Sequence, residues 1–142
     1  MKKLKYWISI ALAGVFALGM GGAVSDTVTD IPEPDRNYSV VLIDQSDVTL
    51  DLENFSFAGH TYVTGKFGKA VISIDFEKID SMTFLLEENN VRALVRLKES
   101  TPIEILMEKN GTAYGEASFG NIRIEVQDIK QVQIHGKVLT SN

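Results

Sequence analysis

The sequence contains no cysteine, and this absence excludes several kinds of structure and chemistry. Disulfide bonds and a lipid-modified cysteine anchor are ruled out, so the fold must be stabilised by its core alone. A cysteine nucleophile is ruled out as well. Only two histidines occur, His60 and His135, and no Gly-x-Ser-x-Gly, His-Glu-x-x-His or phosphate-binding glycine motif is present. We therefore expect a protein that is not an enzyme and that binds no cofactor.

Long apolar runs are absent except near the N-terminus, where the pattern is typical of a secretory signal peptide. A lysine-rich start at residues 2–5 precedes the apolar stretch 8–20, and small residues follow. We predict a signal peptide at 1–25, cleaved after Ser25, with cleavage after Ala23 as the near alternative. The expected location is the periplasm or the cell exterior, with no membrane span after cleavage. An uncleaved N-terminal anchor is the alternative, because the stretch approaches the ~20 residues that a span requires.

Positive charge is scarce in the rest of the chain. Residues 26–142 keep 11 of the 14 basic residues and all 19 acidic residues, so their net charge is −8 (11 − 19). An acidic surface repels phosphate backbones and anionic lipids, which argues against nucleic-acid binding. Residues 26–37 contain two prolines and several acids, which is typical of an extended linker. The remainder, 38–142, has the size of a single domain.

Helical periodicity is absent after the linker, and apolar residues recur at every second position, which indicates β-strands. Short connections predict that consecutive strands pair antiparallel, as a meander. Asn110-Gly111 gives the strongest hairpin signal, because Asn-Gly readily adopts the two positive φ angles of a type I′ turn. The apolar positions change from even to odd numbers near Glu53-Asn54, which predicts a β-bulge. The ten predicted strands are 39–44, 47–53, 60–66, 70–76, 81–86, 91–97, 102–107, 112–118, 121–126 and 130–135.

Two segments, VISIDFEKIDSMTF at 71–84 and NIRIEVQDIKQVQI at 121–134, share one apolar spacing. Steps of two indicate strands, and the two central steps of three indicate a 3₁₀ turn. We therefore predict an internal duplication, with repeats at 38–87 and 88–136. A Phe-Gly pair precedes each of the two segments, at 67–68 and 119–120. The matched residues, 50 positions apart, are Ile72 and Ile122, Ile74 and Ile124, Phe76 and Val126, Ile79 and Ile129, Met82 and Val132, and Phe84 and Ile134.

Each predicted repeat has five strands with a 3₁₀ turn before the last, an order that resembles the small SH3-like and Sm-like barrels. The resemblance covers both repeats as architecture and rests on apolar spacing. It implies an all-β fold of about ten antiparallel strands, forming either two packed SH3-like halves or one sandwich or barrel. We favour a shared core, because ~50 residues bury little apolar surface alone. The acidic charge keeps the nucleic-acid role of Sm-like proteins from carrying over.

Four aromatic residues are candidates for contacting a ligand or partner. Phe67 and Phe119 lie beside glycines at predicted turns, and Tyr62 and Tyr114 occupy comparable places in the two repeats. We expect Phe67 and Phe119 to plug the ends of the sheet, with a binding rim as the alternative.

Charged residues give only weak signals for a site. Asp47, Asp51 and Glu53 line the polar face of one predicted strand, and Asp44 lies across a turn. These carboxylates are weak candidates for calcium, and a solvated face that protects a sheet edge is the default interpretation. The modest basic cluster around Arg92 is expected to be neutralised by acids on neighbouring strands, namely Glu104 or Glu125.

Together these features favour a non-catalytic exported bacterial β protein that acts as a binding or scaffolding module. The expected partner is another envelope or extracellular protein, held at a sheet edge or face by strand addition. Such a mode requires an edge without prolines or inward charges. A homo-oligomer is also compatible with the pattern. The alternatives are a glycan- or calcium-binding module and, less favoured, a carboxylate-based hydrolase.

Overall fold

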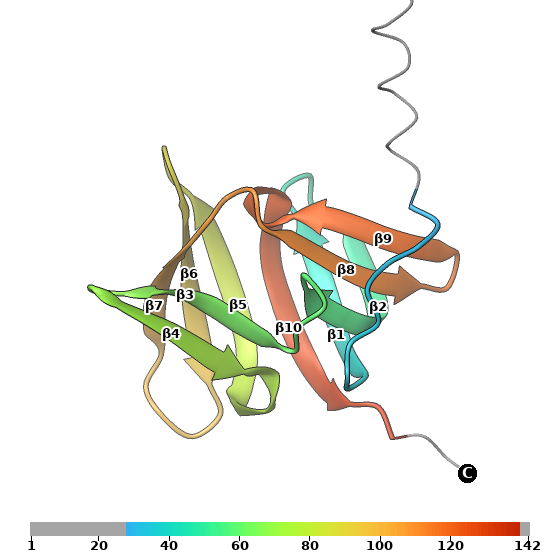
Figure 1. Ribbon diagram of the computed structural model, residues 1–142, viewed down its shortest axis with the longest axis horizontal. Coiled ribbons are helices and arrows are strands. Elements are labelled where there is room, and N and C mark those ends of the chain that lie inside the picture. Colours follow the sequence, from blue (N-terminus) through green and yellow to red (C-terminus); the bar gives the residue numbers. More distant parts are fainter. Residues whose placement is uncertain (1–27, 140–142) are drawn as a thin grey trace, which may run out of the picture.

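The computed structural model describes residues 28–139, which form an all-β structure in agreement with the predicted fold class (Figure 1). The predicted signal peptide lies outside these residues. No helix within 28–139 has the length and apolar character that a membrane crossing demands. The strands are β1 (Tyr38–Asp44), β2 (Thr49–Phe57), β3 (Tyr62–Phe67), β4 (Ala70–Asp75), β5 (Ile79–Leu86), β6 (Val91–Leu97), β7 (Ile103–Met107), β8 (Thr112–Ala117), β9 (Gly120–Glu125) and β10 (Ile129–Lys137). Two 3₁₀ turns, η2 (Phe76–Lys78) and η3 (Val126–Asp128), precede β5 and β10.

All ten strands belong to one curled sheet with the order β4-β3-β7-β6-β5-β10-β1-β2-β8-β9. Figure 1 shows its two five-stranded parts side by side. The first, β4-β3-β7-β6-β5, is built from one continuous stretch of chain, and we call it the contiguous half. The second, β10-β1-β2-β8-β9, joins the first two strands to the last three, and we call it the split half. Each half therefore mixes strands from both predicted repeats.

The strand order has an internal pseudo-twofold arrangement. Exchanging each strand with the one five places along the chain reverses the order of the sheet. Met82 of β5 pairs with Val132 of β10 at the centre, and these two residues are themselves 50 positions apart. Ile79 and Ile129, which follow the two 3₁₀ turns, are both fully buried. The predicted 3₁₀ turns are confirmed, and the duplication stays a prediction that this arrangement supports.

The meander is only partly observed. Five of the nine connections join neighbouring strands, and the other four carry the chain elsewhere in the sheet. The Asn110-Gly111 connection is one of these, and the hairpin predicted there is wrong: β7 and β8 lie in different halves, and neither residue has a positive φ. Its geometry serves the second 3₁₀ turn instead, because the carbonyl oxygen of Gly111 accepts a hydrogen bond from the N–H of Val126 at 2.8 Å.

Alternating apolar residues from both halves fill one continuous core. In β1, for example, Tyr38, Val40 and Leu42 are buried while the residues between them are more exposed. The predicted bulge is confirmed, since the pairing of β2 with β8 shifts register after Glu53 and Asn54 has a φ of 51°. The shift keeps Leu52 and Phe55 both in the core, although their numbers differ in parity.

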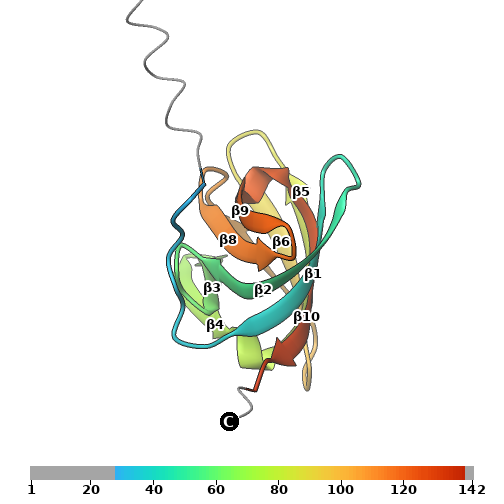
Figure 2. The same ribbon diagram turned by 90° about the vertical axis from the view of Figure 1, so that its right-hand side faces the viewer.

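Residues 28–37 have no regular secondary structure and run along the side of the sheet before β1 (Figure 2). They differ from the free spacer expected of the predicted linker. Pro34 is buried, and the side chain of Asn37 accepts a hydrogen bond from the N–H of Asn54 at the bulge, at 2.7 Å. The prolines that suggested an extended conformation thus also provide apolar surface that packs on the domain.

Candidate functional site

The sheet ends in two edge strands, β4 and β9. Among the described residues, β4 pairs with β3 alone and β9 pairs with β8 alone. The two edges are equivalent under the 50-residue offset: Ala70 closes the first hairpin opposite Phe67, and Gly120 closes the second opposite Ala117. The edges differ in their side chains and also in the N-terminal segment, because Nδ2 of Asn121 in β9 donates to the carbonyl oxygen of Thr29 at 3.5 Å.

The β4 edge directs the backbone groups of alternate residues away from the sheet. Only Gly68 and Lys69 join β3 to β4, and Gly68 has a φ of 64°, as the first loop position of a type II′ turn requires. The pair that closes such a loop is hydrogen bonded, which turns the backbone groups of alternate residues, starting at Ala70, toward β3. The N–H and C=O groups of Val71 and Ser73 consequently face the free edge.

The β4 edge carries few of the side chains that usually protect a sheet edge. Protein sheets usually protect an exposed edge with charged residues or proline. Residues 70–74 contain no charge and no proline, and Val71 is 71% exposed. In β9, Asn121 and Arg123 stand at the positions of Val71 and Ser73. At the position where β9 carries an arginine, β4 thus has a small serine, so β4 lacks the charged side chain that β9 carries on its free side.

A cleft of about 820 Å³ opens on the inward side of the β4 edge. Ile72 and Ile74 of β4 line it, together with Leu97 at the end of β6 and Ile103 at the start of β7. Three of these residues, Ile72, Leu97 and Ile103, are partly buried and pack against the main core. The cleft therefore exposes one side of that core to solvent. The charged residues in its lining are Asp75, Glu77, Lys78, Lys98 and Glu99.

The split half carries a carboxylate at the matching place. Leu97 pairs with Ile79 in the contiguous half, and Asp44 pairs with Ile129 at the equivalent position. The Asp44 carboxylate accepts hydrogen bonds from two backbone N–H groups of the β1–β2 turn, at 2.8 and 2.9 Å. A hydrogen-bonded polar turn thus replaces an apolar side chain that lines the cleft.

The outward sides of the two halves also differ. In the contiguous half, one row across β4, β3 and β7 consists of Val71, Lys66 and Leu106. In the split half, the matching row across β9, β8 and β2 consists of Asn121, Glu116 and Glu53. The first row borders a groove of about 720 Å³ along the two crossovers, 58–61 and 108–111, which we call the crossover groove. The outward row is therefore apolar and cationic beside β4 and acidic beside β9, where Arg123 is the cation on the edge strand itself.

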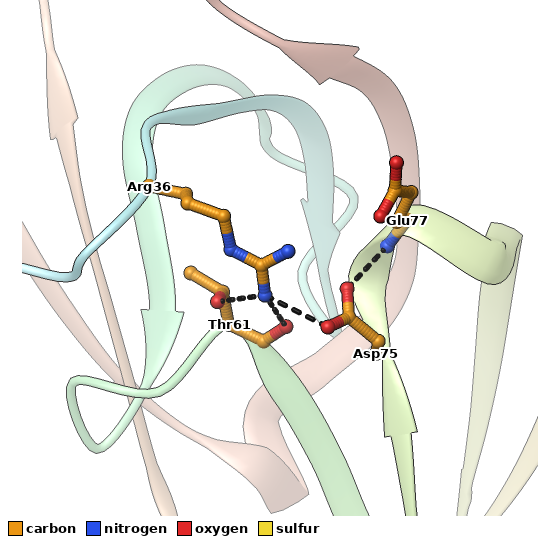
Figure 3. A network of polar contacts seen from close by, with 4 residues as sticks. All are labelled: Arg36, Thr61, Asp75 and Glu77. Carbon is orange, nitrogen blue, oxygen red and sulfur yellow. Dashed lines mark hydrogen bonds and ion pairs between the residues drawn. The ribbon is translucent and has the colours of Figure 1, made fainter.

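A polar network ties the end of β4 to the N-terminal segment (Figure 3). Nη2 of Arg36 donates to Oγ1 of Thr61 at 2.7 Å and to Oδ2 of Asp75 at 2.9 Å. The other Asp75 oxygen accepts the N–H of Glu77 at 2.9 Å and caps η2. The hydrogen bond from Arg36 is the main cause that lowers the pKa of Asp75. An ionised carboxylate at neutral pH therefore holds the end of β4 in position.

The aromatic candidates are divided between the two hairpins and are not brought together. Tyr62 and Phe67 lie on β3, Tyr114 lies on β8, and Phe119 lies in the β8–β9 turn. Phe67 is 50% exposed and Phe119 is 75% exposed, so the expectation that they plug the ends of the sheet is wrong. Phe67 is the last residue of β3 and Phe119 lies in the β8–β9 turn, and at these exposures the core encloses neither ring.

The predicted equivalence of these aromatics is also wrong. At the offset of 50 that relates the two hairpins, Phe67 matches Ala117 and Tyr62 matches Thr112. The Phe-Gly pairs, which lie 52 positions apart, occur at different places in the two turns. Their roles in ligand or partner contact stay predictions, and only Tyr62 and Phe67 belong to the hairpin that contains the β4 edge.

The carboxylate candidates are spread along a turn and a strand. Asp44 closes its own turn, and Asp47 pairs with Lys130 at 2.6 Å. Asp51 and Glu53 are exposed on β2. No three histidine, aspartate or glutamate side chains within residues 28–139 are placed to hold a metal ion. Calcium binding stays a prediction that calorimetry can test, without a cluster to support it.

The basic cluster has partners on its own side of the sheet. Arg92 contacts Glu87 at 2.9 Å and Glu104 at 3.3 Å. The predicted partner Glu104 is thus confirmed, while Glu125 lies on β9, in the other half. These ion pairs account for Arg92 without a ligand.

A family model described as "Uncharacterised protein" matches residues 34–137. The chain belongs to that family. The match spans all ten strands and includes Arg36, which sequence reasoning had assigned to the linker. The composition around Arg36 gives no sign of its contacts, and the start of the family match at the buried Pro34 is the signal that marks this segment as part of the domain. No curated protein and no solved structure matches the chain.

Proposed function

We propose that this chain is a non-catalytic, exported binding or scaffolding module that receives an extended segment of a partner protein as an added strand on β4. The observation that carries the proposal is the difference between two equivalent edges. Arg123 guards β9, and no charge or proline guards residues 70–74 of β4. The partner is another envelope or extracellular protein, in keeping with the predicted signal peptide.

Strand addition uses both kinds of surface at the β4 edge. The free N–H and C=O groups of Val71 and Ser73 supply backbone hydrogen bonds, each contributing about 1 kcal/mol. Alternate side chains of the incoming strand enter the cleft between Ile72 and Leu97, where apolar burial adds about 25 cal/mol per Å². A short segment bound in this way is expected to reach roughly micromolar affinity.

A direct test selects extended peptides from a random displayed library and maps their contacts by hydrogen exchange. We expect the selected peptides to slow exchange at the amides of Val71 and Ser73. Ser73→Pro removes an edge donor while leaving the hydrogen bonds between β3 and β4 in place, because proline is tolerated on the free side of an edge strand. We expect this variant to bind the selected peptides about tenfold more weakly.

Two further variants compare the β4 and β9 edges within the same protein. Arg123→Pro introduces the same change at the equivalent position of β9 and should leave peptide binding unchanged. Ser73→Arg places an arginine on β4 at the position that Arg123 occupies in β9, and it should abolish peptide binding. Selected peptides that protect β9 or the crossovers in place of β4, or a library that yields no binder, would contradict the proposal.

The crossover groove favours one second candidate, a glycan-binding module. The rings of His60 and Tyr62 stack at 4.8 Å, and the amides of Asn89 and Asn90 line the same groove. A partly exposed aromatic ring beside polar amides can contact both the apolar face and the hydroxyls of a sugar. Binding on a glycan array that is lost in Tyr62→Ala would support this function. Absence of binding to every glycan would eliminate it.

A further inference from the structure

We infer that the segment received by the β4 edge carries apolar side chains on its inward face and acidic side chains on its outward face. The inference rests on the proposed strand addition and names the chemistry of the partner. It follows from the two sides of the β4 edge: Ile72 and Ile74 line the inward side, and the outward side combines apolar surface with lysine.

The inward side selects apolar residues. Successive side chains of a strand point to opposite faces, so every second residue of the added segment lies beside Ile72 or Ile74. These positions open onto the cleft of about 820 Å³ that Leu97 and Ile103 complete. A polar side chain placed directly against these aliphatic groups would lose hydration, because the charged residues of the lining belong to the end of β4, to η2 and to the β6–β7 turn. Aliphatic side chains, in contrast, would extend the core.

The outward side selects negative charge. Lys66 is the cross-strand neighbour of Val71, Lys69 lies in the adjoining turn, and both are exposed. Neither lysine takes part in an ion pair among the described residues. Strands lie about 4.8 Å apart, so a carboxylate on a strand beyond Val71 falls within reach of the long Lys66 side chain.

The β9 edge offers the same segment a different set of charges. Glu116 occupies the position of Lys66, and Glu53 pairs with it on the next strand. In the row of Val71 and Asn121, an acidic side chain of an added strand would therefore meet like charge at β9 and opposite charge at β4, whereas Arg123, two residues farther along β9, would attract it. Because the chain as a whole is acidic, with a net charge of −5, the lysines beside β4 form a local exception that can direct binding.

Two synthetic peptides test the charge preference, one alternating isoleucine with aspartate and the other alternating isoleucine with lysine. Affinity is measured by fluorescence anisotropy, and protection of the β4 amides is measured by hydrogen exchange. We expect the aspartate peptide to bind β4 about tenfold more tightly at low salt, with the difference shrinking as salt is added. The double variant Lys66→Glu with Lys69→Glu should reverse the preference, whereas Lys137→Glu, on the exposed end of β10, should preserve it.

The outcomes separate this inference from the proposed function. If both peptides protect β4 equally and Ser73→Pro weakens both, strand addition stands and the preference for acidic residues is overturned. If neither peptide protects β4, both are overturned. Self-association in sedimentation that Ser73→Arg abolishes would show that a second copy occupies the edge, and it would overturn the acidic partner.

Discussion

The β4 and β9 edges occupy equivalent ends of one sheet, yet their surroundings have opposite character. Beside β4 lie Val71, Lys66 and a cleft that four aliphatic side chains line, whereas beside β9 lie Asn121, Glu116 and a hydrogen-bonded turn. Both edges satisfy the same backbone requirements, so folding alone does not demand this difference. The proposed strand addition on β4 rests on this difference between the two edges.

The two crossovers show a second difference, which concerns stability. The carbonyl oxygen of Thr61 accepts a hydrogen bond from the N–H of Phe76 at 3.0 Å, and Gly111 and Val126 form the equivalent bond at 2.8 Å. The side chain of Arg36 reinforces only the first of these crossovers within the described part of the chain. Four predictions test how far the equivalence of the halves extends.

The largest effect is expected at two equivalent glycines, Gly65 in β3 and Gly115 in β8. A Cβ on Gly65 would lie 2.7 Å from the backbone oxygen of Leu106, and a Cβ on Gly115 would lie 3.0 Å from Cδ1 of Leu52. The Leu106 carbonyl cannot move without disturbing the pairing of β3 with β7, whereas the Leu52 side chain can adjust. We expect Gly65→Ala to lower the free energy of unfolding by about 3 kcal/mol and Gly115→Ala by about 1 kcal/mol. Urea unfolding measures both, and equal losses would contradict the asymmetry.

A smaller loss is expected for Arg36→Met, which keeps the aliphatic stem but removes the hydrogen bonds to Thr61 and Asp75. The free energy of unfolding should fall by about 1–2 kcal/mol, because two partly buried acceptors lose a charged donor. Arg123→Met is the matched control on the β9 edge and should change stability by less than about 0.5 kcal/mol. A similar loss of stability in both variants would show that the hydrogen bonds of Arg36 do not distinguish the two halves.

The hydrogen bond from Arg36 to Asp75 should also make stability sensitive to acid. This hydrogen bond lowers the pKa of Asp75 below the ordinary value of 3.8, so the ionised carboxylate favours the folded state above that pH. This contribution is lost as the pH falls through the lower pKa of the folded state. Thermal melts should therefore show that the unmodified protein has a higher melting temperature than Arg36→Met at neutral pH. We expect this difference in melting temperature to shrink below pH 3.8. Narrowing near neutral pH would implicate another group.

The smallest effects are expected at the exposed turn aromatics. Phe67→Ser and Phe119→Ser should each change the free energy of unfolding by less than about 0.5 kcal/mol, because both rings are already largely in water. Thermal or urea unfolding checks the expectation. A loss of about 2 kcal/mol or more in either variant would restore the plug interpretation for that residue.

Features that depend on neighbours along the chain could be predicted from the sequence. All ten strands, both 3₁₀ turns and the bulge near Asn54 follow from the spacing of apolar residues, which reports which side of the backbone must be buried. Pairing could not be read in the same way. Asn110-Gly111 has the local chemistry of a hairpin, but β7 and β8, the strands that flank it, do not pair with each other.

The candidate site was predictable only in outline. An edge without proline or inward charge was expected, and residues 70–74 fit that description, but many alternating strands look alike in sequence. The topology is what leaves β4 at the end of the sheet, and the fold is what sets Leu97 and Ile103 beside it. Arg36 was missed because its partners, Thr61 and Asp75, lie far along the chain.

The amino-acid sequence by itself determined an all-β chain with two matched apolar patterns, because the alternation of side chains along a strand is a local property of the backbone. Only the tertiary structure decided that the two patterns interleave in one sheet, that β4 and β9 become its edges, and that Leu97 and Ile103 lie beside β4. Those outcomes depend on which distant backbone groups pair once a shared core is buried, and residue spacing along the chain does not encode that choice.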